Sequence, residues 1–226
     1  MNRPAVFLDR DGTLIDDVGY PRDPAGVRLV AGAPEALARF RDAGFLLAVV
    51  SNQSGVGRGL ITPDEMDAVH EAFVRAFADA GVTFDAVEYC VHGPDDGCEC
   101  RKPSPGMILD IAERLGVDLA RSFVVGDKDT DAEAGRRAGC HPIRIDRWDA
   151  AAERILADGW DAGPMGCGEL VLALRKRMLA LPPRAMFRLR ATDPAAPEDI
   201  PAWCRLTGHS LESVEHPHYL IRRRET

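Results

Sequence analysis

Short apolar runs alternate with segments of helical period through the first 150 residues of the chain. The apolar runs lie at Val6–Leu8, Phe45–Val50, Phe84–Tyr89, Phe123–Val125 and Ile143–Ile145. Segments with apolar residues every three or four positions lie between them, near 33–43, 62–80, 105–115 and 130–138. This alternation of strands and helices predicts an α/β fold with a doubly wound, Rossmann-like parallel sheet.

The pattern changes after about residue 150. Residues 149–158 predict a helical linker. The elements expected beyond it are a helix over 171–181, a strand over 187–191, a helix near 197–207 and a hairpin that ends in 219–223. These elements predict a small C-terminal α+β two-layer domain, near the lower size limit for independent folding. We therefore expect a first domain over 1–150, a linker over 151–157 and a second domain over 158–226.

The composition is that of a globular protein without a nucleic-acid footprint. Hydrophobic residues make up 46% of the chain and charged residues 28%, and the net charge is −8. Residues 1–160 hold 18 basic and 28 acidic side chains, whereas residues 161–226 hold 10 basic and 8 acidic ones. This change in charge balance along the chain supports a division into two units. No apolar run approaches the roughly 20 residues of a membrane helix, and the first residues show no signal peptide. We therefore expect a cytoplasmic protein.

Polar clusters follow directly on three of the apolar runs. They are Asp9–Thr13, Ser51–Gly59 and Gly126–Asp131. In a parallel, doubly wound sheet, ligands bind beyond the carboxyl ends of the strands. We therefore expect the three clusters to converge on one edge of the sheet.

The first cluster, Asp9-Arg10-Asp11-Gly12-Thr13, carries two carboxylates at a strand end. Such a pair can bind a hard cation, and one carboxylate can attack phosphorus while the other transfers protons. A calcium loop would place another acid at Thr13. The motif by itself leaves a catalytic loop and a solvated turn about equally open. Further groups suited to phosphoryl transfer favour the catalytic loop: the Ser51 hydroxyl, the Asn52 amide, the Lys102 and Lys128 cations and the Asp127 carboxylate.

These motifs in this order resemble the haloacid-dehalogenase superfamily of phosphohydrolases, from about residue 4 to 150. The resemblance implies that Asp9 is the nucleophile and Asp11 the general acid/base. It also implies that Mg²⁺ is held by Asp9, the backbone carbonyl of Asp11, and Asp127. The phosphoryl group would be held by Ser51, Lys102 and Lys128, so that the catalytic set is Asp9, Asp11, Ser51 and Lys102. No large cap insertion is visible.

Four metal-binding side chains lie within the loop 90–100. They are Cys90, His92, Cys98 and Cys100. Three thiolates and an imidazole suit tetrahedral Zn²⁺, and the full ligand set predicts a structural site. The alternative is a group of unconnected surface residues, which is less favoured because cysteines rarely cluster on a surface. The loop leads directly into Arg101 and Lys102, so we expect it to orient both cations.

This metal loop resembles one branch of the superfamily, which contains D-glycero-D-manno-heptose-1,7-bisphosphate 7-phosphatases and histidinol-phosphate phosphatases. Segments 17–20, 51–59 and 101–107 resemble the heptose enzymes, whereas the short spacer between His92 and Cys98 resembles the histidinol-phosphate group. We expect removal of the 7-phosphate of the heptose bisphosphate, with histidinol phosphate or a broader range of sugar phosphates as alternatives. The resemblance implies that the substrate contacts are Asp17, Gly19, Tyr20, Ser51, Asn52, Gln53, Ser54, Arg58, Arg101, Lys102 and Lys128. Arg58 or Arg101 would anchor the phosphate that stays on the sugar.

Residues 158–226 resemble TusA-like sulfur-carrier domains. In that family the cysteine stands in Cys-Pro-x-Pro at a helix N-terminus, where the helix dipole favours the thiolate. Here Cys167 is retained, both prolines are missing, and Glu169 adds a negative charge. We therefore favour a structural module or one that binds a protein partner, and active sulfur transfer is the alternative. Cys140 and Cys204 are expected to be buried, and His70 to lie on a helix surface.

Overall fold

A computed structural model describes residues 2–225 and divides the chain into two compact units between Ala152 and Glu153. Each unit has a hydrophobic core of its own. Helix α6 (Trp148–Leu156) crosses the division, where the sequence predicts a helical linker. Among the described residues, no helix is both long and apolar enough to cross a membrane.

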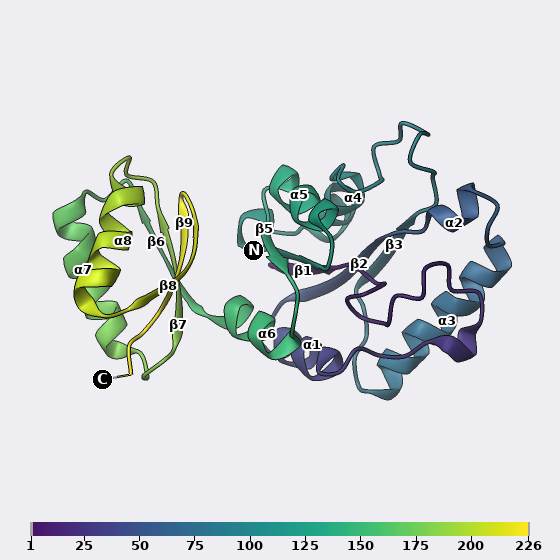
Figure 1. Ribbon diagram of the computed structural model, residues 1–226, viewed down its shortest axis with the longest axis horizontal. Coiled ribbons are helices and arrows are strands. Elements are labelled where there is room, and N and C mark those ends of the chain that lie inside the picture. Colours follow the sequence, from purple (N-terminus) through teal and green to yellow (C-terminus); the bar gives the residue numbers. More distant parts are fainter. Residues whose placement is uncertain (1, 226) are drawn as a thin grey trace. The chain divides into compact units, whose positions relative to one another are not determined.

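The first unit is built on a five-stranded sheet. Its strands are β1 (Ala5–Leu8), β2 (Leu46–Asn52), β3 (Ala86–Cys90), β4 (Phe123–Gly126) and β5 (His141–Arg144). All neighbours are parallel, in the order β3-β2-β1-β4-β5 (Figure 1). The chain therefore winds outward in both directions from β1, which confirms the doubly wound fold. A ligand crevice is expected where the order reverses, between β1 and β4.

Helices cover both faces of this sheet. The longer ones are α1 (Ala33–Asp42), α3 (Pro63–Asp79), α4 (Gly106–Leu115) and α5 (Asp129–Ala138). The shorter ones are α2 (Ser54–Gly57) and the 3₁₀ helices η1 (Pro24–Gly26) and η2 (Leu119–Arg121). Figure 1 shows α4 and α5 on one face, with α1, α3 and α6 on the other. The sequence pattern did not predict α2, because it is one turn of glycine-rich chain.

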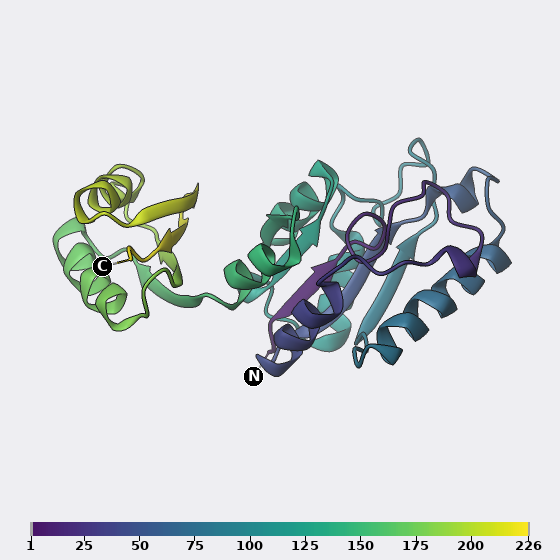
Figure 2. The same ribbon diagram turned by 60° about the horizontal axis from the view of Figure 1, so that its bottom comes forward.

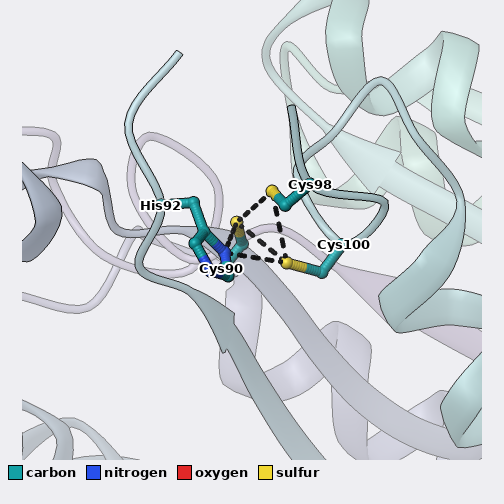
Figure 3. A group of neighbouring side chains, drawn as sticks. All are labelled: Cys90, His92, Cys98 and Cys100. Atoms are coloured by element: carbon teal, nitrogen blue, oxygen red, sulfur yellow. Dashed lines mark hydrogen bonds between the residues drawn. The ribbon is translucent and has the colours of Figure 1, made fainter. Parts of the chain in front are cut away.

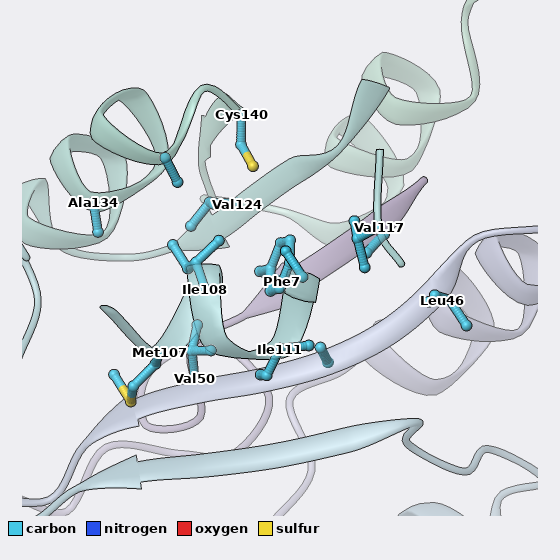
Figure 4. Close-up of a cluster of buried hydrophobic side chains, with 14 of the residues drawn as sticks. Phe7, Leu46, Val50, Met107, Ile108, Ile111, Val117, Val124, Ala134 and Cys140 are labelled. Atoms are coloured by element: carbon cyan, nitrogen blue, oxygen red, sulfur yellow. The ribbon is translucent and has the colours of Figure 1, made fainter. Parts of the chain in front are cut away.

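The alternation of side chains along the strands supplies a core on each face. Ala5 and Phe7 of β1 are fully buried in the cluster that includes Ile108 and Ile111 of α4 (Figure 4). Because side chains alternate between the two faces of a strand, Val6 and Leu8 of β1 pack on the other face of the sheet. Burial of each large apolar side chain contributes about 1.5–3 kcal/mol. Cys140 belongs to the cluster with Phe7, as predicted for a buried cysteine.

Helix α3 begins at a reciprocal capping box. The Thr62 hydroxyl accepts a hydrogen bond from the Glu65 N–H at 3.1 Å, and the Glu65 carboxylate accepts one from the Thr62 N–H at 2.7 Å. His70 on this helix was predicted to be a surface residue and is instead half-buried. Its ring packs edge-on against Tyr89 of β3, and Nδ1 lies 3.0 Å from the Tyr89 hydroxyl.

The second unit is a small α+β domain. Its elements are β6 (Asp158–Gly163), α7 (Cys167–Ala180), β7 (Met186–Ala191), α8 (Ala196–Thr207), β8 (Ser210–Glu215) and β9 (His218–Arg222). The sheet order is β6-β7-β9-β8, and only β6 and β7 are parallel. Figure 2 shows both helices on one face of this sheet, which is the predicted two-layer arrangement.

The core of this unit lies between the sheet and its two helices. It includes Leu170 and Leu174 of α7, Trp203 of α8 and the predicted buried cysteine Cys204. Helix α7 begins at Cys167, four residues earlier than predicted, because its first three residues are exposed and lack the apolar pattern.

Candidate active site

The loops that follow β1, β2 and β4 meet at the carboxyl edge of the five-stranded sheet. The Asp9 N–H donates to the Val125 carbonyl at 2.9 Å, which joins the end of β1 to β4. Trp148 of α6 donates from Nε1 to the Thr13 carbonyl at 3.0 Å, in a buried hydrogen bond that fixes the far end of the first loop. The three polar clusters therefore share one edge, where sequence and topology place a ligand site.

Lys102 lies at the centre of this edge and is almost fully buried. Its Nζ donates to Asp9 Oδ1 at 2.7 Å and to the Val50 carbonyl at 2.7 Å, and it lies 2.6 Å from Asp131 Oδ1. Burial alone would lower the pKa of Lys102, but the carboxylates of Asp9 and Asp131 outweigh it and raise the pKa. Lys102 is therefore a permanent cation beside Asp9.

The backbone of Lys102 is fixed to strand β2. The Asn52 Nδ2 donates to the Lys102 carbonyl at 2.9 Å, and the Lys102 N–H donates to Asn52 Oδ1 at 3.0 Å. This pair of bonds uses both ends of the amide. Asn52, predicted to contact substrate, therefore positions the loop that carries the cation.

Asp131, which ends the third polar cluster and for which the sequence predicted no role, is 2% exposed. It lies in the first turn of α5, and its Oδ2 accepts from the Lys128 N–H at 3.0 Å. Its pKa is raised by burial, and Lys102 opposes that effect. A side chain on Gly126 would collide with its carboxylate, so the glycine is required here. One signal was available, because Asp131 shares the apolar face of α5 with Ala134 and Ala138.

Three carboxylates form a group that fits a divalent cation. Asp9, Asp127 and Asp131 each place an oxygen within 4.8 Å of the others. Asp127 Oδ1 is buried and has no hydrogen-bond partner among the described residues, so it is available to a ligand. Carboxylate oxygens are the ligands that Mg²⁺ prefers. The pKa of Asp127 is raised, first by burial and further by Asp9, and Lys128 opposes both.

Gly12 lets the first loop pass close to this group. Its φ is +81°, in the left-handed region that favours glycine, and a Cβ there would lie 2.7 Å from Asp127 Oδ2. The motif Asp-x-Asp-Gly therefore needs its glycine for two separate reasons, backbone conformation and contact with the neighbouring carboxylate.

The Asp11 side chain is bound by Gln53 and Arg10. Gln53 Nε2 donates to Asp11 Oδ2 at 2.6 Å and lies 3.1 Å from Ser51 Oγ. Arg10 donates to both Asp11 oxygens. Gln53, predicted as a substrate contact, thus binds the proposed acid/base and also contacts Ser51. Arg10 was not predicted at all.

The remaining predicted contacts form two pairs and a separate arginine. Lys128 Nζ lies 3.2 Å from Asp17 Oδ2, and Asp17 Oδ1 accepts from the Gly19 N–H at 2.8 Å. Arg58 donates to the Tyr20 hydroxyl at 2.8 Å, close to Ser54 at the start of α2. Arg101 donates to the His92 carbonyl at 3.2 Å.

The four predicted zinc ligands lie together (Figure 3). The five sulfur–sulfur and sulfur–nitrogen distances that join Cys90, His92, Cys98 and Cys100 run from 3.2 to 3.6 Å. A zinc–sulfur bond of about 2.3 Å gives tetrahedral edges of roughly 3.8 Å, so the cluster is close to the required size. Burial raises the pKa of the Cys90 thiol to about 12.

The fold and the Asp-x-Asp-Gly-Thr loop define the chain as a HAD-like hydrolase. Residues 99–153 match the HAD-hydrolase-like family, and residues 161–223 match the Sulfurtransferase TusA family. The first unit is therefore a hydrolase domain, and the second unit matches a family of sulfur-transfer proteins.

Curated relatives refine this class. The D-glycero-beta-D-manno-heptose-1,7-bisphosphate 7-phosphatase of Pseudomonas aeruginosa is 40% identical over 146 residues, which are 64% of this chain and 82% of the relative. The enzyme of the same name from Bordetella bronchiseptica is 43% identical over 138 residues, or 61% and 77%. The chain belongs to this phosphatase family within the HAD-like hydrolases.

Solved structures agree with this assignment. The D,D-heptose 1,7-bisphosphate phosphatase of B. bronchiseptica, complexed with magnesium and phosphate, is 37% identical with a TM-score of 0.58. The match covers 76% of this chain and 86% of that one. A HAD-like phosphatase from Mesorhizobium loti has a TM-score of 0.59 at 34% identity, covering 73% and 74%.

Replacement of Lys102 tests the charge balance of the site. In Lys102→Met the buried carboxylates of Asp9 and Asp131 lose their cation, so we expect the free energy of unfolding to fall by about 3–5 kcal/mol. Lys128→Met is the matched control, because the exposed pair with Asp17 contributes about 1 kcal/mol or less. Urea unfolding at neutral pH without divalent cations measures both. Equal losses in the two variants would contradict this account.

Proposed function

We propose that the chain is a magnesium-dependent phosphomonoesterase that acts through a phospho-aspartate at Asp9 and removes the 7-phosphate of D-glycero-D-manno-heptose 1,7-bisphosphate. The observation that carries the proposal is the placement of the Asp9 carboxylate between the Lys102 ammonium and the carboxylates of Asp127 and Asp131. The heptose-phosphatase relatives support the substrate, and the relative complexed with magnesium and phosphate supports the cofactor.

The residues that would hold Mg²⁺ are Asp9, Asp127 and the backbone carbonyl of Asp11. When bound, the cation neutralises charge on the transferring phosphoryl group and aligns it with Asp9. Asp131 lies in the same group and holds Lys102 in place. Oδ1 of Asp127, which has no hydrogen-bond partner among residues 2–225, is available to such a ligand.

The reaction proceeds in two displacements. An Asp9 oxygen attacks phosphorus, the bond from phosphorus to the sugar oxygen breaks, and Asp11 gives that oxygen a proton. Asp11 then takes a proton from water, the water oxygen attacks phosphorus, and the bond to Asp9 breaks. Inorganic phosphate leaves and Asp9 is restored. Lys102, with Ser51 and Lys128, offsets the charge on the phosphoryl oxygens during both steps.

Two guanidinium groups are suited to anchor the phosphate that stays on the sugar. The described partners of Arg58 and Arg101 are neutral, a phenol and a carbonyl, whereas Lys128 faces Asp17. Both arginines lie beside one segment, because the N–H of Gly57 donates to the Val91 carbonyl and Arg101 donates to that of His92. A guanidinium binds phosphate oxygens in a bidentate manner. This supports a bisphosphate over histidinol phosphate, which has no second phosphate.

A phosphate-release assay with Mg²⁺ tests the substrate. We expect kcat/KM for the heptose bisphosphate to exceed that for histidinol phosphate by at least about tenfold, because only the former can engage both arginines. A faster rate with histidinol phosphate would contradict the proposed substrate.

Replacement of Asp9 tests the nucleophile. Asp9→Asn should lower phosphate release by at least about 10³-fold while folding normally, since the variant loses the attacking oxygen but keeps the shape of the side chain. Near-normal phosphate release by Asp9→Asn would contradict the assignment of the nucleophile.

We infer that Cys90, His92, Cys98 and Cys100 hold a structural Zn²⁺. Their mutual distances support a tetrahedral site in which the protein fills all four positions. The loop continues into Arg101 and Lys102, and the Gly106 N–H donates to the Glu99 carbonyl at 3.2 Å, which closes the segment on itself. The zinc would thereby fix the position of Lys102 in the active site.

Elemental analysis tests this inference. We expect about one zinc per chain, and Cys98→Ser should lose it because the remaining three ligands leave an open position. Cys167→Ser is the matched control, since that exposed cysteine lies in the other unit and should leave the zinc content unchanged. Folded wild-type protein without zinc, or full zinc content in Cys98→Ser, would refute the site.

We propose that residues 1–150 form the phosphatase domain, 151–157 a linker and 158–226 a module that binds a protein partner. Cys167 begins α7 and is exposed, as a sulfur carrier requires. The pKa of Cys167 is nevertheless raised, first by interaction with the Asp199 carboxylate, then by desolvation and by the negative charges of Asp199 and Asp193. These carboxylates disfavour the thiolate that accepts sulfur. The residues therefore favour binding over sulfur transfer.

The reactivity of Cys167 tests the effect of Asp199. Because Asp199 raises the pKa, Asp199→Asn should lower it, so that more thiolate is present near pH 8 and alkylation by iodoacetamide is severalfold faster. Glu198→Gln removes a neighbouring exposed charge and should change nothing. The alkylation rate of Cys167, followed by peptide mass spectrometry from pH 6 to 10, measures both. An unchanged profile in Asp199→Asn would contradict the assignment.

A further inference from the structure

Arg10 is a buried charge to which the proposed reaction assigns no role. It stands between the proposed nucleophile Asp9 and the proposed acid/base Asp11, and its side chain is 1% exposed. Burial of a guanidinium costs several kcal/mol unless a partner compensates the charge. A neutral side chain would fill the same space at lower cost, so the contacts of Arg10 call for an explanation.

The Arg10 guanidinium binds the carboxylate of Asp11 through two hydrogen bonds. Nε donates to Oδ1 at 3.2 Å and the terminal nitrogen donates to Oδ2 at 3.1 Å, so that the two planar groups meet as a fork. The Tyr89 ring supports the other side, with its centre 5.2 Å from the guanidinium carbon. Tyr89 is in turn held by His70 through its hydroxyl. This stack fixes the plane of the Asp11 carboxylate.

Gln53 makes the two oxygens of Asp11 unequal. Its Nε2 donates to Oδ2 at 2.6 Å, in addition to the bond that Oδ2 already accepts from Arg10. A carboxylate oxygen has two lone pairs, so Oδ2 is saturated. Oδ1 accepts one hydrogen bond, from Arg10, in the part of the chain that the structure describes. One lone pair of Oδ1 is left for a proton.

We propose that Arg10 and Gln53 form a clamp that presents Oδ1 of Asp11 as the atom that transfers the proton. The inference rests on the proposed function. In the first displacement the proton leaves Oδ1 for the sugar oxygen as the bond between that oxygen and phosphorus breaks. In the second, Oδ1 takes a proton from water as the water oxygen bonds to phosphorus and the bond from phosphorus to Asp9 breaks. Arg10 and Gln53 touch neither reacting atom and are positioning residues.

Two substrates with different leaving groups separate this role from a merely structural one. A sugar alkoxide needs a proton as it leaves, whereas p-nitrophenolate leaves as a stable anion. Rapid-quench measurement gives the rate of phospho-enzyme formation from each. For Arg10→Met and Gln53→Leu, we expect a loss of about 10²-fold or more with the sugar phosphate. The loss with p-nitrophenyl phosphate should be only a few-fold, and KM for the sugar phosphate should be nearly unchanged.

Arg10→Lys separates the effect of the positive charge from that of the two parallel hydrogen bonds to Asp11. A lysine keeps the charge but cannot contact both oxygens in one plane, so it should lose as much with the sugar phosphate as Arg10→Met. Arg75→Met, an exposed arginine on α3, is the matched control and should match wild type with both substrates. Gln53→Leu provides the same test if Arg10→Met fails to fold, since Gln53 makes its own hydrogen bond to Asp11.

The outcomes are distinguishable. Equal losses with the two substrates in every folded variant would overturn the clamp, because a structural defect does not depend on the leaving group. Recovery of the sugar-phosphate rate in Arg10→Lys would overturn the role of the fork. Wild-type protein that forms no phospho-enzyme from either substrate would instead overturn the proposed function on which the clamp depends.

Discussion

The buried ammonium of Lys102 is the interaction on which the site depends. Asp9, Asp127 and Asp131 converge within 4.8 Å, and like charges at that spacing repel strongly in a water-poor interior. Lys102 compensates two of them directly, at 2.7 and 2.6 Å, while Asn52 fixes its backbone to β2. The doubly wound sheet brings these groups together from distant parts of the sequence. The third carboxylate keeps an unpaired oxygen, and the site is therefore poised for a divalent cation and a phosphoryl group.

Charge compensation also supports the different roles that are proposed for the two aspartates of the first loop. Asp9 faces the cation and the other carboxylates, whereas Asp11 is turned toward Arg10 and Gln53. These different surroundings support the proposal that Asp9 attacks phosphorus and Asp11 transfers protons, although they stand two residues apart. The left-handed backbone at Gly12 lets the loop make this turn while staying in contact with Asp127.

The fold could be predicted in detail from local patterns, and the site only in part. Apolar runs and helix boundaries depend on neighbouring residues, so the five parallel strands and the four longer helices between them lie where the sequence places them. Residues after strand ends, such as Asp9 and Asp127, could be found because topology brings them to one edge. No role could be predicted for Asp131, although it ends a polar cluster, because it lies within a helix and pairs with Lys102 from another segment. The contacts of Arg10 and Gln53 with Asp11 could not be predicted for the same reason, since they are tertiary.

The central claim is that Asp9 carries the phosphoryl group during turnover. Rapid acid quench within one turnover, followed by peptide mass spectrometry and by reduction of the acyl phosphate with borohydride, tests it directly. The account predicts a peptide heavier by one phosphoryl group, with residue 9 converted to homoserine after reduction. Steady release of phosphate from the wild-type enzyme, with residue 9 unmodified at every quench time, would contradict it.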